Sequence, residues 1–508
     1  MKELDRAAME QHGVPGLLLM ENAGRAFVDA LERHHPIAPG SRVAVVAGKG
    51  NNGGDGFVIA RHLLTRGYAV DLLETVPVQE LHGDARTNRE ILGTFFGGRF
   101  RAAIVGKAPE AAAGSPPGVI VDALLGTGFT GALSGVYALI AEWVNGSGAF
   151  VASVDVPSGV DATSGAVQGT AVRADLTVTL GLAKPGLYLR AGREHSGEVV
   201  VVDIGIPLDL AKAGGGAVRR ITASDAARWL PRRRGDAHKY SVGKVYVLGG
   251  SLSFTGAPCL AAESALVGGA GAVVLGVPSA IHQTVAGKLA EVIVQPLPGT
   301  PAGTVASGAR AMIEERCAWA DVVVIGPGLG RHPETDALIR ELALKVDRPL
   351  VLDADALNAL AGQGESLRGR SKGTVLTPHT GELARWTGEK SPAIEARRVE
   401  AAREAAQKFG SIVVLKGAPT ATAWPDGTVV LNASGNPGMA TIGSGDVLTG
   451  LLAGMWAQGM RAEEAAAAAV FVHGCAGDEA RRILGERSVR ASDILRALPG
   501  VFLSLEGA

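Results

Sequence analysis

The sequence has few cysteines and aromatic residues, and neither sign of charge dominates it. Three cysteines occur in 508 residues, they form no CxxC pair, and aromatic residues make up 4% of the chain. An odd number of isolated cysteines predicts no disulfide framework and favours a reducing compartment. Lys and Arg total 49 against 50 Asp and Glu, so no overall field favours nucleic acid or an anionic membrane. The one basic run, RRRG at 232–235, is typical of a solvated linker.

Long apolar runs and two common motifs are also absent. No run of ~18 uncharged apolar residues could form a membrane-spanning helix, and the charged start MKELDRAAMEQ lacks the apolar stretch of a signal peptide. No GxxxxGK[ST] motif occurs, which excludes a P-loop NTPase. We therefore expect a cytoplasmic protein without a membrane or nucleic-acid partner.

Short Val-rich runs, each ended by Gly or Pro, recur along the chain and predict strands buried on both faces of parallel sheets. In the first half these runs are 42–48, 69–75, 118–126, 149–159, 176–182 and 199–207. After a weak stretch near 208–225, the second series is 244–250, 271–278, 321–328, 349–355, 373–379 and 411–418. The pattern predicts an α/β protein of two domains.

Ligands of such sheets bind beyond the carboxyl ends of the strands. One of these ends, GKGNNGGDGF (48–57), carries a GxGxxG pattern after a strand, which resembles a dinucleotide-binding fingerprint. The pattern is weak evidence, because the carboxylate of Asp55 would repel a pyrophosphate bound to the helix amides. A plain dinucleotide cradle is therefore doubtful.

Polar residues also follow two other predicted strands of the first domain, in VDALLGTG (121–128) and VDVPSGVD (154–161). A single Asn or Asp in a loop is typical of a turn or a helix cap. Several of them at the ends of one sheet instead offer oxygen ligands for a cation and a carboxylate facing a bound molecule. The residues concerned are Asn52, Asp122, Asp155 and Ser158.

The second domain contains the turn GSGD followed by VLTGLLAGMWAQG, which predicts a helix from about Asp446 to Gln458, ended by Gly459. Amides at such a helix start attract phosphate oxygens. Asp446 alone is typical of an N-cap, but beside a transferable phosphate it could take the proton of an attacking hydroxyl. Upstream, KGAPT (416–420) follows a strand and supplies Lys416 for a nucleotide's phosphates.

Taken in order, these motifs resemble the bifunctional NAD(P)H-hydrate repair enzyme family over nearly the whole chain. In that family an NAD(P)H-hydrate epimerase domain precedes an ADP-dependent (S)-NAD(P)H-hydrate dehydratase domain. Besides the motifs quoted above, the resemblance rests on LMENAG (19–24), HK (238–239), GGS (249–251), GPGLG (326–330), LDADALN (352–358), TPHTGE (377–382) and NPGMATIGSGDVLTG (436–450). Thr380 stands where the family usually has Pro, and IGSGD varies the residues before the acid.

The resemblance implies a Rossmann-like three-layer epimerase domain at 1–212 and a ribokinase-like dehydratase domain at 221–508. The hydrate in the first domain would contact Asn51, Asn52, Gly53, Gly54, Asp55, Gly126, Thr127, Gly128, Phe129, Thr130, Gly131, Ala132 and Asp155. Potassium would be held by Asn52, Asp122 and Ser158. In the second domain the hydrate would contact Ala257, Gly328, His379 and Asp446, and the adenine nucleotide Lys416, Gly417, Ala418, Pro419, Thr420 and Gly445.

The resemblance also implies the chemistry. Asp155 would move a proton as the epimers interconvert at C6 through a ring-opened or iminium-like species. In the second domain the C6 hydroxyl would be phosphorylated by ADP, with Asp446 as base, and phosphate would then leave to restore NADH or NADPH. Magnesium would bridge the nucleotide phosphates, with Asp353 or Glu382 orienting its waters. The partners would be the two hydrates, NADHX and NADPHX, with ADP as co-substrate, and the chain would form a homo-oligomer.

Two other functions fit parts of the sequence. The second half alone is compatible with an ATP-dependent kinase for a vitamin or sugar, fused to a dinucleotide-binding sensor domain. A binding protein without turnover is the other alternative, and the presence of Asp122, Asp155 and Asp446 argues against it. A stable phosphorylated product would indicate the kinase, whereas free phosphate with recovered reduced nicotinamide would exclude it.

Overall fold

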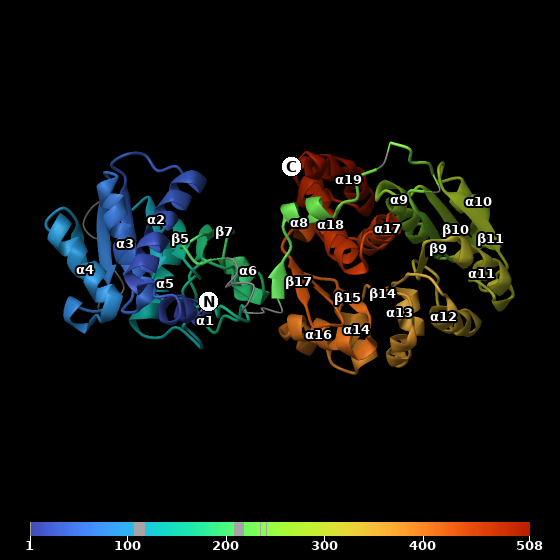
Figure 1. Ribbon diagram of the computed structural model, residues 1–508, viewed down its shortest axis with the longest axis horizontal. Helices are drawn as coiled ribbons and strands as arrows, with labels where there is room; N and C mark the ends of the chain where they lie inside the picture. Colours follow the sequence, from blue (N-terminus) through green and yellow to red (C-terminus); the bar gives the residue numbers. More distant parts are fainter. Residues whose placement is uncertain (1, 106–116, 208–217, 234, 240, 508) are drawn as a thin grey trace. The chain divides into compact units, whose positions relative to one another are not determined.

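The computed structural model describes residues 2–105, 117–207, 218–233, 235–239 and 241–507. The chain forms two compact units, Met1–Gly216 and Ala217–Ala508, each built around one sheet (Figure 1). Most of the predicted linker, residues 208–217, lies outside the described residues. The predicted start of the second domain at residue 221 is too late by one strand, because Val218–Arg220 forms β8 and pairs with the second sheet.

The first unit contains a parallel sheet in the order β3-β2-β1-β4-β5-β6-β7. Its strands are β1 (Arg42–Ala47), β2 (Ala69–Glu74), β3 (Arg101–Ile104), β4 (Val119–Ala123), β5 (Phe150–Val154), β6 (Leu176–Leu180) and β7 (Glu198–Val202). The strand order reverses between β1 and β4, which places a crevice at their carboxyl ends. Those ends carry the motifs 48–57 and 121–128.

Helices cover both faces of this sheet, as a three-layer fold requires. Val43 and Val45 of β1 pack in a core with α2 (Gly16–His34), α3 (Asn51–Thr65) and α4 (Gly83–Phe96). Ala44 and Val46 point to the opposite face, where the core includes α5 (Val136–Gly146). The remaining helical segments of this unit are α1 (Lys2–Glu10), η1 (Val78–Glu80), η2 (Pro185–Leu187) and α6 (Arg190–His195).

The second unit contains a mixed sheet in the order β11-β10-β9-β12-β13-β14-β15-β16-β17-β8. The strands from β11 to β15 are parallel, and β16 and β17 form an antiparallel hairpin beside β15. Their bounds are β9 (Lys244–Leu248), β10 (Ala272–Pro278), β11 (Ile293–Leu297), β12 (Val322–Ile325), β13 (Leu350–Leu352), β14 (Thr374–Leu376), β15 (Ile412–Leu415), β16 (Thr420–Ala423) and β17 (Val429–Asn432).

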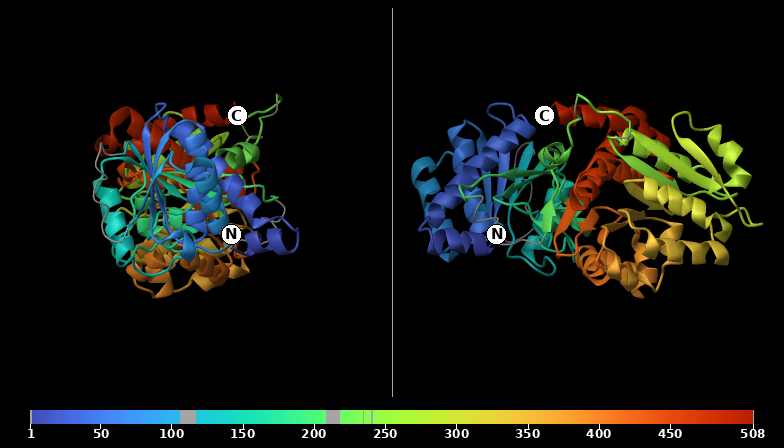
Figure 2. Two further views of the ribbon diagram at one scale, coloured as in Figure 1. Left: turned by 90° about the vertical axis from the view of Figure 1, so that its left-hand side faces the viewer. Right: turned by 45° about the vertical axis from the view of Figure 1, so that its right-hand side comes forward.

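One face of this sheet is covered by the helices α9 (Ala257–Val267), α17 (Ser444–Ala457), α18 (Ala462–Leu484) and α19 (Ala491–Glu506), which share a core with its strands (Figure 2). Among the helices of the other face are α11 (Arg310–Trp319), α12 (Pro333–Lys345) and α16 (Arg398–Phe409). The shorter helical segments are α8 (Ala223–Trp229), η3 (Ser279–Ile281), α10 (His282–Ala286), η4 (Ser307–Ala309), α13 (Asp355–Ala359), η5 (Gly364–Gly369), α14 (Thr380–Thr387), α15 (Ser391–Ala396), η6 (Pro437–Met439) and η7 (Glu486–Ser488).

The helices α9 and α17 approach each other closely because two glycines of α17 face α9. A β-carbon at Gly450 would lie 1.9 Å from the carbonyl oxygen of Ala261, and one at Gly454 would lie 2.2 Å from that of Ala265. Any side chain at these positions would push the helices apart. This contact fixes α17, whose first turn carries Asp446.

The structure corrects the sequence prediction at three places. Residues 51–55 lie in α3 rather than in a loop, and α17 begins at Ser444, so Asp446 is the third helical residue and Gly443 is the N-cap. The prediction also missed the edge strands β3 and β11, the hairpin β16–β17 and β8. Every residue of β3 is exposed, so this strand lacks the buried apolar run that marks the others. No helix in the described ranges is both long and apolar enough to cross a membrane.

Candidate active sites

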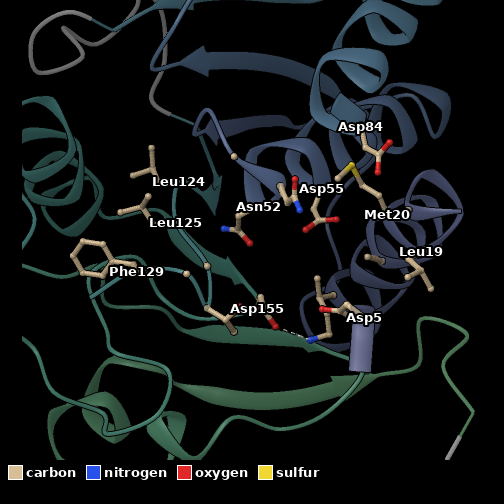
Figure 3. Close-up of a pocket in the computed structure, with 18 of the residues that line it drawn as sticks. Asp5, Leu19, Met20, Asn52, Asp55, Asp84, Leu124, Leu125, Phe129 and Asp155 are labelled. Carbon is tan, nitrogen blue, oxygen red and sulfur yellow. Dashed lines mark hydrogen bonds between the residues drawn. The ribbon is translucent and has the colours of Figure 1, made fainter. Parts of the chain in front are cut away.

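The first unit has a cavity of about 630 Å³ at the carboxyl ends of β1, β4 and β5 (Figure 3). Among the residues predicted to contact substrate, those lining it are Asn51, Asn52, Asp55, Gly126, Thr127, Gly128, Phe129, Thr130 and Asp155. Gly53, Gly54, Gly131 and Ala132 do not line it. Side chains of α1 and α2 close another side of the cavity, among them Asp5, Leu19 and Met20.

The glycines of the 48–57 segment allow close packing. A β-carbon at Gly53 would lie 1.8 Å from the carbonyl oxygen of Gly48, and one at Gly48 would lie 1.9 Å from that of Leu124. A β-carbon at Gly54 would lie 2.7 Å from the Met20 side chain. These residues therefore hold the start of α3 against β4 and α2. The GxGxxG pattern has a packing role here, which agrees with the doubt about a plain dinucleotide cradle.

Asp155 follows β5 with its backbone in the left-handed region, at φ 68°. Its Oδ1 accepts hydrogen bonds from the backbone N–H of Leu180 at 3.1 Å and the hydroxyl of Thr179 at 3.3 Å. Lys184 forms an ion pair with the same oxygen, and its Nζ also donates to the carbonyl of Leu180 at 2.7 Å. Both Asp155 and Lys184 are buried and line the cavity. Lys184 was not predicted as a site residue, because no motif around it indicates an ion pair with Asp155.

Asp122 lies at the end of β4 and is completely buried. Its Oδ1 accepts from the hydroxyl of Ser158 at 2.6 Å and its Oδ2 from the hydroxyl of Ser153 at 2.8 Å and the N–H of Ser158 at 2.9 Å. Burial raises the pKa of Asp122, although the hydrogen bonds from Ser158 oppose this. Among the described residues, only neutral groups donate to this carboxylate.

The second site lies where β12, β13, β14 and β15 end and α17 begins. Lys416, after β15, places its Nζ 2.8 Å from Oδ1 of Asp353 and 4.0 Å from Oε2 of Glu382. Thr449 of α17 donates to the other oxygen of Asp353 at 2.7 Å. A β-carbon at Gly445 would lie 3.3 Å from the Lys416 Nζ. The lysine therefore lies against the start of α17, where the predicted phosphate and Asp446 would meet.

The charges at this site are unbalanced, because the carboxylates of Asp353, Glu382 and Asp446 surround the single amine of Lys416. Burial and the nearby Asp353 raise the pKa of Asp446 to about 7. Burial likewise raises the pKa of Glu382 to about 7, although Lys416 opposes the shift. Burial works against the charged form of Lys416, but Asp353 and Glu382 outweigh it and raise the pKa of the amine. An added cation would be favoured at this site, which agrees with a metal–nucleotide ligand.

The other predicted residues of the second site are those that would contact the hydrate, Ala257, Gly328 and His379, and those of the nucleotide-binding segment. Ala257, at the start of α9, lies beside Gly328, where a β-carbon would be 3.2 Å from that of Ala257. His379 caps α14, and its Nδ1 accepts from the N–H of Gly381 at 2.9 Å. Burial and Lys416 lower the pKa of His379, so the ring is neutral at pH 7 and carries its proton on Nε2.

The nucleotide-binding segment predicted from KGAPT joins β15 to β16, and Thr420 is the first residue of β16. The buried guanidinium of Arg398 donates to the carbonyls of Leu415 at 3.2 Å and Lys416 at 3.0 Å. Gly417, with φ 150°, lies directly against this guanidinium, and Ala418 precedes a cis-proline, Pro419. Arg398 was not predicted, since it lies in an ordinary helical pattern.

Comparison with known proteins assigns the chain to a family. Residues 16–186 match the profile described as YjeF-related protein N-terminus, and residues 245–500 match that of NAD(P)H-hydrate dehydratase. The bifunctional NAD(P)H-hydrate repair enzyme of Moorella thermoacetica is 43% identical over 510 residues, covering 100% of this chain and 96% of that protein. The chain belongs to the bifunctional NAD(P)H-hydrate repair enzyme family.

Further members and solved structures agree with this family. The repair enzyme of Salinibacter ruber is 40% identical and covers 99% of this chain and 94% of that protein. The ADP/ATP-dependent NAD(P)H-hydrate dehydratase of Bacillus subtilis, crystallised with ATP and Mg²⁺, matches with a TM-score of 0.50 and 29% identity, covering 57% of this chain and 99% of that one. A ribokinase-like protein of Enterococcus faecalis matches with a TM-score of 0.51, 25% identity and coverages of 58% and 98%. The second unit therefore has the ribokinase-like fold that the sequence predicted.

Of the three residues predicted to hold potassium, Asp122 and Ser158 are hydrogen-bonded to each other, and Asn52 lines the cavity beside Gly126. A β-carbon at Gly126 would lie 3.0 Å from the Oδ1 of Asn52, and the Nδ2 of Asn52 is buried without a hydrogen-bond partner in the described part of the chain. Among the described residues, no cationic side chain forms a hydrogen bond or ion pair with the buried Asp122. A set with a single carboxylate suits a monovalent cation. The described residues contain no group of three or more His, Cys, Asp or Glu side chains that could hold a metal ion.

Proposed function

We propose that the first unit interconverts the R and S epimers of NADHX and NADPHX, and that the second unit dehydrates the S epimer, with ADP converted to AMP and phosphate. The arrangement of Lys416, Asp353 and Asp446 at the start of α17 carries this proposal for the second unit. Similarity over the full length of the repair enzymes supports the pairing of both activities in one chain.

Phosphorylation of the C6 hydroxyl is the first step in the second unit. Asp446, once ionised, accepts the hydroxyl proton, while Lys416 and the N–H groups at the start of α17 stabilise charge on the transferred phosphoryl group. Hydroxide is a poor leaving group and phosphate a good one, so the ring nitrogen can then expel phosphate. The products are reduced nicotinamide, AMP and phosphate.

Ions have separate roles in the two units. Magnesium would neutralise charge on the nucleotide phosphates, and Asp353 and Glu382 supply the nearest carboxylate oxygens. Because the described residues contain no group of three or more His, Cys, Asp or Glu side chains that could hold a metal ion, the ion would depend on the nucleotide and water for its other ligands. Potassium, held by Asn52, Asp122 and Ser158, would compensate the buried Asp122 charge and fix the 126–130 segment beside the substrate.

The domain limits, cellular location and assembly belong to the same proposal. We assign the epimerase to residues 1–212 and the dehydratase to the remainder from residue 217, so that β8 is included. A cytoplasmic location and a homo-oligomer are proposed from the composition and the family resemblance. Light scattering of the purified chain would measure the oligomeric state.

The decisive experiment supplies a mixture of purified hydrate epimers with ADP and magnesium. The parent chain should convert both epimers to reduced nicotinamide with one phosphate released per molecule. Asp155→Asn should consume the S epimer and then stall, because its second unit is intact but the R epimer is no longer supplied to it. High enzyme concentration and short times limit spontaneous epimerisation. A stable phosphorylated hydrate, with no recovery of reduced nicotinamide, would instead show a small-molecule kinase.

A further inference from the structure

Four carboxylates line the cavity of the first unit, those of Asp5, Asp55, Asp84 and Asp155, together with one buried lysine, Lys184. Lys184 forms an ion pair with Asp155, whereas Asp55 has no hydrogen bond or ion pair within the described ranges although it is only 9% exposed. Figure 3 shows Asp55, from α3, and Asp155, after β5, both directed into this cavity, with Asp5 of α1 beside them. The two site carboxylates therefore differ in their surroundings.

Asp155 is surrounded by hydrogen-bond donors. Three groups donate to its Oδ1, and one of them is the ammonium of Lys184. Its Oδ2 has no partner among the described residues and is available to the cavity. A carboxylate so arranged can accept a proton from a molecule in the cavity.

Asp55 has the opposite surroundings. Its buried carboxyl group receives no donor, and its charged neighbours include the carboxylates of Asp155 and Asp5. Burial is the largest cause that raises its pKa well above the usual value, Asp155 and Asp5 raise it further, and Lys184 only partly opposes them. Burial and the neighbouring carboxylates therefore favour the protonated form of Asp55.

Resting on the epimerase function proposed above, we infer that Asp55 is the general acid of epimerisation, that Asp155 is the general base, and that Lys184 positions Asp155. Asp55 donates its proton to the C6 hydroxyl as the C6–O bond breaks and water leaves. The lone pair of the ring nitrogen forms the C6=N bond of an iminium ion. Water then attacks the opposite face of C6 and gives its proton to Asp155, while the C=N electrons return to nitrogen.

The proton balance closes through water in the cavity. One turnover moves a proton from Asp55 to Asp155, and transfer back through solvent restores the starting state. By microscopic reversibility the opposite epimer uses Asp155 as acid and Asp55 as base. Reaction in H₂¹⁸O distinguishes this path from ring opening, because breaking the C6–O bond places solvent oxygen in the product, whereas an opened aldehyde that closes directly retains the original oxygen.

The test measures epimerisation of each purified hydrate without nucleotide, using the full chain. Asp55→Asn keeps the size of the side chain but removes the proton donor, so epimerisation should fall at least ~100-fold. Dehydration of the S epimer with ADP by the same variant should stay at the parent rate, which shows that the second unit is unaffected, and its circular dichroism spectrum should match that of the parent chain, which shows that the first unit is folded. Asp55→Glu should recover part of the rate. The matched control, Glu90→Gln, replaces an exposed acid of α4 outside the cavity and should leave both activities unchanged.

Lys184→Met tests the positioning role. It should slow epimerisation and move the acidic limb of its pH profile to higher pH, since Asp155 loses the cation that favours ionisation. A purely structural lysine would lower the rate without moving this limb. In the parent chain, epimerisation should also fall on the alkaline side, as Asp55 loses its proton.

Near-parent epimerisation by Asp55→Asn would overturn the inference, and so would parent product that retains its original oxygen. If Asp55→Asn fails to fold, a parent rate that continues to rise with pH would still contradict an acid role for Asp55. If the parent chain does not accelerate epimerisation at all, the proposed function of the first unit fails instead.

Discussion

At the residue scale, Asp446 is the acid on which dehydration depends. Asp446→Asn keeps the shape of the side chain but removes the base, so the rate of dehydration should fall at least ~100-fold. ADP should still bind, because Lys416 and the start of α17 are unchanged. Calorimetry with ADP and a coupled assay of phosphate release would measure both quantities. Glu479→Gln, on the exposed side of α18, is the matched control, and near-normal turnover in Asp446→Asn would refute the assignment.

The pH dependence of the second unit follows from the same carboxylates. With a pKa of about 7 for both Asp446 and Glu382, kcat/KM for the S epimer should fall as pH drops below about 7, because the base becomes protonated. Stability should change in the opposite direction. Both pKa values lie above those of the unfolded chain, so the free energy of unfolding should decrease as pH rises from about 4 to 7. Activity profiles over this range would test the loss of kcat/KM at lower pH, and urea titrations would test the gain in unfolding free energy.

Residue roles were only partly predictable from sequence. Asp122, Asp155, Lys416 and Asp446 could be found because each lies at or just after the end of a strand or in the first turn of a helix, and parallel strands bring such ends together. Lys184 and Arg398 could not be found, since each acts through contacts formed only after folding. Lys184 lies after the end of β6 in a segment without any motif. Arg398 is the first residue of α16 and donates to the carbonyl of Leu415 at the end of β15.

At the scale of elements, the close contact between α17 and α9 is what holds Asp446 in place. Gly450→Ala would put a methyl group 1.9 Å from the Ala261 carbonyl oxygen, so α17 must shift. We expect a loss of about 1–3 kcal/mol in unfolding free energy and slower dehydration, with unchanged epimerisation. Gly500→Ala in α19 is the matched control, because nothing lies within 4 Å of its added β-carbon, and it should be neutral or stabilising. Equal stability of the two variants would show that the α9–α17 contact can relax.

The elements themselves divide into predictable and unpredictable ones. The buried parallel strands β1, β4 and β9 could be predicted because a strand covered on both faces must be apolar throughout. The edge strands β3 and β11 and the hairpin β16–β17 could not, since β3 is exposed, β11 is largely exposed or half-buried, and β16 consists of alternating Thr and Ala, so that their apolar signal is weaker. The start of α17 was placed two residues late, because Gly443 caps it through a left-handed backbone rather than a side chain.

At the scale of the whole molecule, each unit has its own sheet, core and candidate site. A fragment of residues 1–212 should therefore fold and epimerise the hydrate without nucleotide, and a fragment of residues 217–508 should dehydrate the S epimer with ADP. A second fragment that starts at residue 221 lacks β8 and leaves the edge of β17 unpaired, so it should unfold at lower temperature. Circular dichroism and the two assays would test this. A folded 1–212 fragment without epimerase activity would contradict the assignment of the first unit.

The left-handed backbone at Asp155 limits which residues could replace it during evolution. Glycine and asparagine accept this conformation about as readily as aspartate, whereas β-branched residues do not. Both tolerated replacements are a single base change away from an aspartate codon, and neither carries a proton acceptor. The backbone conformation therefore does not prevent loss of the base in one mutational step, but the buried Lys184 would then lose its charged partner. Conservation of the fold alone therefore does not show whether a relative still turns over its ligand. The identity of the residue at the position of Asp155 is the guide to that.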